Sequence, residues 1–501
     1  MSLKKLLAVI VLISLNQSLH AAVSVSGIFG DHMVLQQNMQ VQVWGWAEVG
    51  EKIKVTFGSQ SIATTADENG QWRVWLAPMK ASDDPQTLSI ASSNAIEFTD
   101  ILIGEVWLCS GQSNMELPPT QGLVNPDVEI NAANWPKIRL NLLDKVVADR
   151  PLKDLKGNWT ACTPLTMRRF SAAAYFFGRE LHQDLKVPIG LIGDYYGGSN
   201  GQSWTSRAAL SADPDLNAYL TQWDARLANA PPTTAPDDVP QRPSNGNGST
   251  SRYRPANFFN AMIAPLAPFA IRGVIWYQGE ANTNNAHDAG LYAKLFPAMI
   301  KDWRYRWGES DFPFIFVQLP TSEPNYPDPT DSAWARVRES QQTALDLPNT
   351  AMIVTLDIGE GAVVHAHNKK DVGLRLAGAA LSGVYDRSLA VCDYPLYSRM
   401  EIQGGNVVIH FAHADAGLVL KDPAKGFAIS GADKNFVWAD AKLDGNTVIV
   451  SSPKVPAPVA VRYAWADNPD VSLFSKNGLP AAPFRTDDWP AGKISNPRAS
   501  P

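Results

Sequence analysis

Gly104-Glu-Val-Trp-Leu-Cys-Ser-Gly-Gln-Ser-Asn-Met-Glu-Leu-Pro118 extends an apolar run that begins at Ile101 and stops abruptly at small and amide residues. A buried parallel strand that ends in this way delivers a hydroxyl to the carboxyl edge of a sheet. Ser113 is therefore the candidate nucleophile. The competing interpretation is a serine in a turn or at a helix N-cap. An activated serine also needs a base and donors for the oxyanion, so these must be sought elsewhere in the chain.

Composition excludes several classes of protein. The chain has 501 residues, of which 45% are hydrophobic, and this length predicts about three globular domains. Charged residues make up 18% and the net charge is -6, without a long run of Lys or Arg, so nucleic acid is not expected as a partner. Sixteen tryptophans are many. Such residues form platforms for sugar rings, but they also fill cores.

The first 22 residues resemble a secretory signal peptide. Lys4-Lys5 precede an apolar run from Leu6 to Leu15, and a polar stretch then ends in Ala21-Ala22. A buried N-terminal helix is the alternative. No later segment reaches the length of a membrane span, so we expect no membrane insertion and a periplasmic or secreted protein.

The three cysteines, Cys109, Cys162 and Cys392, allow at most one disulfide within the chain. Three pairings are possible, and the sequence does not choose between them. Their spacing matches no zinc site, so a structural metal is not expected.

The hydrophobic pattern changes twice along the chain. Residues 23–100 alternate with period two and predict an antiparallel β-sandwich module. Residues 101–392 alternate apolar strands with helices and predict an α/β catalytic domain with a mostly parallel sheet, interrupted by a mobile loop or lid at 229–256. Alternation returns in a C-terminal β module, 393–487, followed by a tail, 488–501. The expected parallel strands are 101–108, 187–193, 271–277, 312–318 and 351–356, and the expected helices are 171–185, 291–307, 335–345 and 370–381.

Several motifs in one order resemble the sialate O-acetylesterase family within the SGNH hydrolases, which includes bacterial carbohydrate acetylesterases. They are Met33-Val-Leu-Gln36, Gly104 to Met115, Phe170-Ser-Ala-Ala-Ala-Tyr-Phe-Phe-Gly-Arg-Glu180, Val187-Pro-Ile-Gly-Leu-Ile192, Met262-Ile-Ala-Pro-Leu266, Gly273-Val-Ile-Trp-Tyr-Gln-Gly-Glu280, His365 with Asn368-Lys369, and Tyr463-Ala-Trp-Ala-Asp-Asn-Pro469. The resemblance spans almost the whole mature chain. It implies an SGNH-type three-layer α/β/α sandwich flanked by the two β modules, with Ser113 as the nucleophile.

The base is expected to be a histidine, because neutral imidazole takes a proton near pH 7 and returns it. The resemblance places it at His365, since 364–369 matches the family pattern Ile-His-Pro-x-Asn-Lys; His367 is the alternative. The family aspartate two or three residues earlier is replaced here by Val363 or Ala362. Asp357, Glu360 or a backbone carbonyl are then the candidates to orient the imidazole.

The resemblance also nominates donors for the oxyanion: the backbone amide of Ser113, Gly198 and the side chain of Gln278. A glycine lets the backbone approach the substrate, and a glutamine donates without competing as a base. Asn114 is interpreted as the cap of the following helix, and Glu280 as a residue that holds loops by hydrogen bonds. For Tyr196, Trp204 and Trp276, lining a sugar face and packing the sheet edge are both open.

The leading hypothesis is a serine esterase that removes O-acetyl groups from a carbohydrate, without a metal or organic cofactor. O-acetylated sialic acid and acetylated plant polysaccharides such as xylan or xyloglucan are the candidate substrates. The alternatives are a non-catalytic carbohydrate-binding protein and a glycosidase that uses Glu280. The oligomeric state is not predicted.

Overall fold

The computed structural model describes residues 22–229, 239–246, 248–308, 311–323, 327–361, 363–387 and 394–490. The predicted signal peptide up to residue 21, Cys392 and most of the predicted tail lie outside these residues. In the part of the chain that is described, no helix is both long and apolar enough to cross a membrane.

The fold is mixed α/β, built around an 11-stranded sheet whose central strands run in the order β10-β9-β11-β8-β12-β13-β14. These strands are β8 (Ala95–Gly111), β9 (Trp135–Leu143), β10 (Gly157–Cys162), β11 (Ile189–Tyr195), β12 (Gly273–Tyr277), β13 (Phe314–Val317) and β14 (Thr350–Ile353). All neighbours on this path are parallel except β10, which is antiparallel to β9. Each of the five apolar runs predicted as a parallel strand lies in this sheet.

The four long helices predicted from the sequence pack on this sheet: α5 (Ala172–Leu185), α8 (Ala286–Trp307), α9 (Ala333–Gln342) and α10 (Lys369–Gly383). Ser171 caps α5 by accepting a bond from the backbone N of Ala174. Trp107 of β8 contacts Phe177 of α5, whereas Trp276 of β12 contacts Phe296 of α8. Trp107 is in register with Gly273, three residues before Trp276, so α5 and α8 lie on opposite faces of the sheet.

Short helices connect these elements. The strands β9 and β10 were not predicted. The short helices are α1 (Ser113–Glu116), α2 (Pro119–Gly122), α3 (Pro126–Asn131), α4 (Pro164–Met167) and α6 (Arg207–Ala212). The 15-residue helix α7 (Pro214–Ala228) is long and was not predicted. Cys109 and Cys162 are buried free thiols, so of the three possible disulfides the one between these two is not formed.

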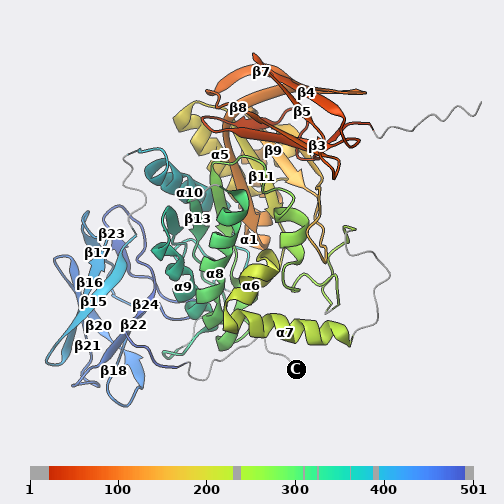
Figure 1. Cartoon of the computed structure of the whole chain (residues 1–501). Coiled ribbons are helices and arrows are strands. Elements are labelled where there is room, and N and C mark those ends of the chain that lie inside the picture. Colours follow the sequence, from red (N-terminus) through yellow and green to blue (C-terminus); the bar gives the residue numbers. More distant parts are fainter. Residues whose placement is uncertain are drawn as a thin grey trace, which may run out of the picture.

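The N-terminal module shares a strand with the central sheet. It contains β1 (Ser24–Val25), β2 (Val34–Gln36), β3 (Val41–Trp46), β4 (Lys52–Phe57), β5 (Gln60–Thr65), β6 (Gln71–Leu76) and β7 (Ser82–Ala91). The first part of the 17-residue β8 pairs with β7, and its last part pairs with β11 and β12. The change of pattern near residue 100 therefore falls inside one continuous strand (Figure 1). The burial of the strand changes at this point, but the strand itself does not end.

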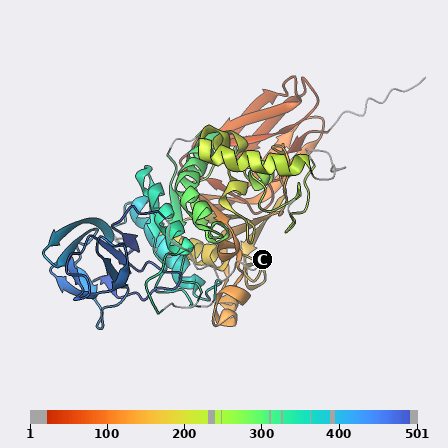
Figure 2. The ribbon, with the colours of Figure 1, turned by 90° about the horizontal axis from the view of Figure 1, so that it is seen from below.

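The C-terminal module contains three separate antiparallel sheets, with the orders β15-β16-β21-β20, β17-β23 and β19-β18-β22-β24. Its strands are β15 (Leu396–Gln403), β16 (Asn406–Ala412), β17 (Leu418–Leu420), β18 (Phe427–Ser430), β19 (Phe436–Trp438), β20 (Asp440–Asp444), β21 (Thr447–Ser451), β22 (Ala460–Tyr463), β23 (Leu473–Ser475) and β24 (Phe484–Arg485). Seen from below, this module stands to one side of the central unit, away from the N-terminal strands (Figure 2).

Side chains rather than strands join the C-terminal module to the centre. Arg338 of α9 is completely buried and donates hydrogen bonds to four carbonyl oxygens. Two belong to the segment after β13, Leu319 and Pro320, and two to the C-terminal module, Ala466 and Asp467. Burial lowers the pKa of Arg338 to about 9.

In the predicted loop 229–256, the residues from 239 onwards that the structure describes are hydrogen-bonded to the central unit. Gln241 and Val147 exchange two backbone hydrogen bonds of 2.9 and 3.0 Å. Arg252 donates to the carbonyl of Gly197 at 3.1 Å, and Arg254 forms an ion pair with Asp149. These partners are distant in sequence, so the composition of the loop gave no sign of them.

Candidate active site

The turn after β8 requires glycine and fixes the start of α1. Gly111 has φ of +137°, and a Cβ there would lie 2.2 Å from the carbonyl oxygen of Tyr277 at the end of β12. The next residue, Gln112, donates its backbone N–H to the same oxygen at 3.0 Å. Ser113 then begins α1, half-buried, at the carboxyl edge of the sheet.

Ser113 and His365 are hydrogen-bonded to each other. The Oγ of Ser113 lies 2.9 Å from the Nε2 of His365, although the two residues are 252 positions apart. His365 lies in the loop between β14 and α10 and is half-buried. A serine hydroxyl bonded to an imidazole is the arrangement in which the ring accepts the proton as the oxygen attacks.

The two carboxylates nominated to orient the imidazole have other partners. Asp357 accepts two hydrogen bonds from the guanidinium of Arg375, at 2.7 and 2.6 Å. Glu360 accepts from the backbone N and the ring Nδ1 of His367, at 2.6 and 2.8 Å. These contacts place His367, the alternative base, against Glu360, while His365 is the histidine that reaches Ser113.

The loop after β11 lies against Ser113. A Cβ on Gly197 would lie 3.6 Å from the Cβ of Ser113, so the two backbones are close. The neighbouring Gly198 has φ of +72°, a conformation that favours glycine. A Cβ on Gly198 would also lie 2.6 Å from the Nη1 of Arg252, which packs over this turn.

Gln278 ties together the segments that follow three strands. It is fully buried, and its Nε2 donates to Gln112 at 3.2 Å, to the carbonyl of Ser199 at 3.2 Å and to Asn282 at 2.9 Å. Its Oε1 accepts from the hydroxyl of Tyr292 at 2.8 Å. The glutamine side chain is thus part of the framework that spaces the turns after β8 and β11.

Asn114 does not cap a helix, which corrects the sequence interpretation. Gln112 is the N-cap of α1, and the side chain of Asn114 is completely buried. Its Nδ2 donates to Glu280 at 2.5 Å and to the carbonyl of Val364 at 3.0 Å. Its Oδ1 accepts from the Nζ of Lys369 at 2.7 Å. Every partner is distant in sequence, so local capping rules did not reveal this role.

Asn114 and Lys369 together hold both sides of His365. Asn114 binds the carbonyl of the preceding residue, and Lys369 donates to the carbonyl of the following residue, Ala366, at 2.8 Å. Burial lowers the pKa of Lys369 to about 8, and burial raises the pKa of Glu280. The segment that carries the serine is therefore fastened to the histidine loop by a buried polar network.

Comparison with known proteins places this chain in a family. The sequence model of the family described as carbohydrate esterase, sialic acid-specific acetylesterase matches residues 245–382. Sialate O-acetylesterases of Mus musculus and Homo sapiens are 28% and 29% identical, over 91% and 90% of this chain and 92% and 90% of their own lengths. A solved carbohydrate acetylesterase from Xanthomonas citri is 35% identical, with a TM-score of 0.82, and the match covers 93% of this chain and 100% of that one.

The chain belongs to this carbohydrate esterase family. It is a carbohydrate O-acetylesterase, and so a hydrolase. Among the residues with described positions, no group of three or more His, Cys, Asp or Glu is placed to hold a metal ion in the acetylesterase.

Two of the three aromatic residues considered for a sugar face are core residues of the acetylesterase. Trp204 and Trp276 have no exposed surface. Trp204 stacks on Phe258 at 4.8 Å between ring centroids, and Trp276 lies edge-on to Trp303 at 5.6 Å. The packing interpretation is therefore correct for both indoles, because no face is open to a ligand. Tyr196 is half-buried.

Proposed function

We propose that Ser113 and His365 carry out the deacetylation through an acetyl-enzyme. The Oγ of Ser113 attacks the acetyl carbonyl carbon while the Nε2 of His365 accepts its proton. The sugar oxygen then leaves with that proton, and the acetyl group stays on Ser113. Water, deprotonated by His365, attacks the acetyl-enzyme, and acetate leaves as the proton returns to Ser113. The 2.9 Å contact between the two side chains carries this proposal.

We also propose that the oxyanion of each tetrahedral intermediate is stabilised beside the turns after β8 and β11. The backbone amides of Ser113 and Gly198 are the candidate donors, and the close approach of the two loops supports this role. Gln278 is the third candidate. Its two amide N–H groups are already shared among three protein oxygens, so one of these contacts must break before Gln278 can donate to the oxyanion.

The domain organisation and location proposed here follow from the sequence and the arrangement of elements. The central unit is interpreted as an SGNH-type three-layer α/β/α sandwich, which the placement of α5 and α8 on opposite faces supports. Residues 1–22 are proposed to be a signal peptide and the mature enzyme to act in the periplasm or outside the cell. Mass determination of the mature N-terminus tests this assignment.

The mechanism is tested by acetate release from 4-nitrophenyl acetate and from acetylated xylan, acetylated xyloglucan and O-acetylated sialic acid. Ser113→Ala and His365→Ala should each lower kcat by several orders of magnitude, up to about 10⁶-fold, because they form one catalytic unit. The preferred polymer identifies the natural substrate class.

Two matched variants serve as controls. Ser110→Ala removes a hydroxyl of the same motif that is buried without a hydrogen-bond partner, so activity should be retained. His367→Ala removes the histidine that contacts Glu360 and should leave most of the activity. Full activity of Ser113→Ala, or equal losses in His365→Ala and His367→Ala, contradicts the mechanism. Release of reducing ends in place of acetate indicates a glycosidase.

A further inference from the structure

A cavity of about 630 Å³ lies between the C-terminal module and the segment 329–331 that precedes α9. Its size is in the range of ligand-binding pockets, about 300–1,000 Å³. Its lining residues include none of the residues assigned above to the reaction. The cavity is therefore a separate feature of the molecule.

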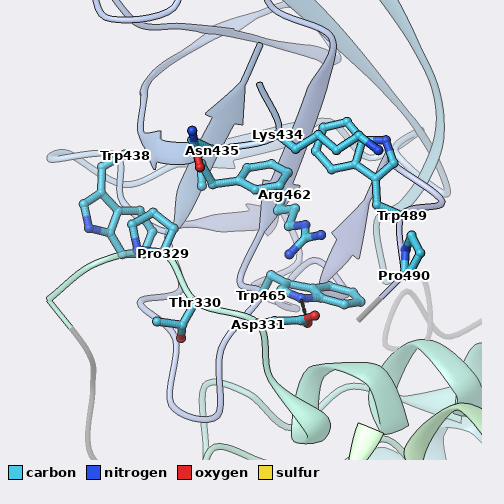
Figure 3. Close-up of a pocket in the computed structure, with 13 residues that line it drawn as sticks. Pro329, Thr330, Asp331, Lys434, Asn435, Trp438, Arg462, Trp465, Trp489 and Pro490 are labelled. Atoms are coloured by element: carbon cyan, nitrogen blue, oxygen red, sulfur yellow. Dashed lines mark hydrogen bonds between the residues drawn. The ribbon is translucent and has the colours of Figure 1, made fainter. Parts of the chain in front are cut away.

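Aromatic side chains from separate strands and loops form its walls. Figure 3 shows Trp438 beside Pro329 at one side, Trp489 under the side chain of Lys434 at the other, and Trp465 between them. Trp438 is 45% exposed, although its Nε1 donates to the carbonyl of Pro327 at 2.7 Å. This bond fixes the indole and leaves ring surface open.

Two of the three charged side chains that line the cavity are paired, and the third, Lys434, lies with its Nζ 5.2 Å from the centre of the Trp489 ring. Arg462 is held by two hydrogen bonds of 2.8 Å from its guanidinium to Asp487. Asp331 accepts from Arg336 at 2.5 Å and from the indole of Trp465 at 3.2 Å. An anionic ligand therefore gains little from Arg462, and the exposed ring of Trp438 is the main aromatic surface open to a ligand.

These features suit pyranose rings. The axial C–H bonds of such a ring carry partial positive charge and pack on the negative face of an aromatic system. Hydroxyl groups at the ring edge find the donors and acceptors of Lys434, Asn435 and Thr330, which also line the cavity. Rigid indoles provide this contact area at little cost in conformational entropy.

We propose that this cavity binds a neutral polysaccharide chain built of pyranose rings. The cavity would then hold the polymer from which the Ser113 site removes acetyl groups, and this role rests on the proposed function. The distal contact raises the residence time of a polymer without touching the reacting ester.

The segment from Trp465 to Asn468 supports this link. Trp465 lines the cavity, and three residues later the Nδ2 of Asn468 lies 3.3 Å from the position of a Cβ on Gly361, in the loop that carries His365. An extended chain spans at most about 3.6 Å per residue, so Trp465 lies no more than roughly 35 Å from His365. A short stretch of polymer is long enough to reach both sites.

Binding is measured by isothermal titration of the full chain with deacetylated xylan, deacetylated xyloglucan and polysialic acid. We expect wild type to bind a neutral polymer and Trp438→Ala and Trp489→Ala to bind it about tenfold more weakly or worse, as for other buried aromatic contacts. Trp75→Ala is the matched control, because Trp75 is 48% exposed on the N-terminal module. Thermal unfolding of each variant confirms that it is folded.

Three outcomes overturn the proposal: wild type binds neither neutral polymer, the Trp438 and Trp489 variants bind like wild type, or polysialic acid binds more tightly than both neutral polymers. Acetate release from 4-nitrophenyl acetate is measured on the same wild-type sample. Esterase activity without polymer binding refutes the cavity assignment alone, whereas polymer binding without acetate release refutes the proposed mechanism alone.

Discussion

The two β modules are attached to the catalytic unit by different kinds of bond. The N-terminal module continues into the central sheet through β8, so its attachment is a ladder of backbone hydrogen bonds. The C-terminal module has its own sheets and is attached mainly through side chains such as Arg338, together with a backbone bond of 3.1 Å from Ser322 to Asp467. A shared strand fixes position and leaves little room for a ligand. An attachment through side chains leaves a cavity at the boundary, and this is where the polysaccharide site is proposed.

The largest effect is expected at Arg338, which supports the C-terminal attachment. Arg338→Ala removes the donor for four buried carbonyl oxygens and leaves a cavity. We expect a loss of about 4 kcal/mol in the free energy of unfolding, measured by urea denaturation. Hydrogen exchange should rise most at 464–468. If hydrogen exchange rises equally across the N-terminal module, the proposed difference between the two attachments is wrong.

A smaller effect is expected at Gly104, within the shared strand. The Cβ in Gly104→Ala would lie 1.9 Å from the carbonyl oxygen of Pro188, so the backbones must separate. We expect a loss of about 2–3 kcal/mol in the free energy of unfolding together with lower esterase activity, because Ser113 follows directly after this strand.

Gly290→Ala is the control for this substitution. Gly290 lies in α8, and nothing stands within 4 Å of its added Cβ. The control should be neutral or stabilising by up to about 1 kcal/mol. If both alanine variants unfold with the same free energy, the strand does not set the position of the serine.

The smallest effect is expected at Asp100, an ion pair at the N-terminal boundary. Hydrogen bonds from Arg139 hold the pKa of Asp100 below its usual value. The stabilisation is therefore complete above about pH 4 and is lost as the pH falls through the lowered pKa. Asp100→Asn should unfold about 1 kcal/mol more easily at pH 7, and the gap to wild type should close towards pH 3.

Asp83→Asn provides the matched exposed pair, since Asp83 bonds Lys137 at the surface. Its effect on the free energy of unfolding should be smaller at every pH. A constant gap for Asp100→Asn between pH 7 and pH 3 would show that the carboxylate charge is not what matters there.

Strands and helices with a single strong pattern were predictable from the sequence. The five apolar runs and four amphipathic helices have one periodicity each, and all are present. In β9, Lys137, Arg139 and Asn141 interrupt the apolar residues, so no such run is visible. The division near residue 100 was misleading because a change in burial within one strand resembles a change of domain.

The site was predictable only for residues that lie in a recognisable sequence motif. The serine and the histidine lie in recognisable segments, and they meet in the fold. The network of Asn114, Glu280 and Lys369 depends on contacts between residues 166 and 255 positions apart, and nothing in local sequence encodes such a contact. Burial of Trp204 and Trp276 is likewise a property of the packed core.

The continuous strand β8 has a consequence for shortening this enzyme. A protein that starts at residue 101 loses the first part of the strand, Ala95 to Asp100, and the entire β7 that pairs with it. Ile101 and Ile103 then become the exposed, unpaired start of a central strand. Ser113 follows the other end of this strand. Trimming the N-terminal module would therefore yield a fragment that aggregates.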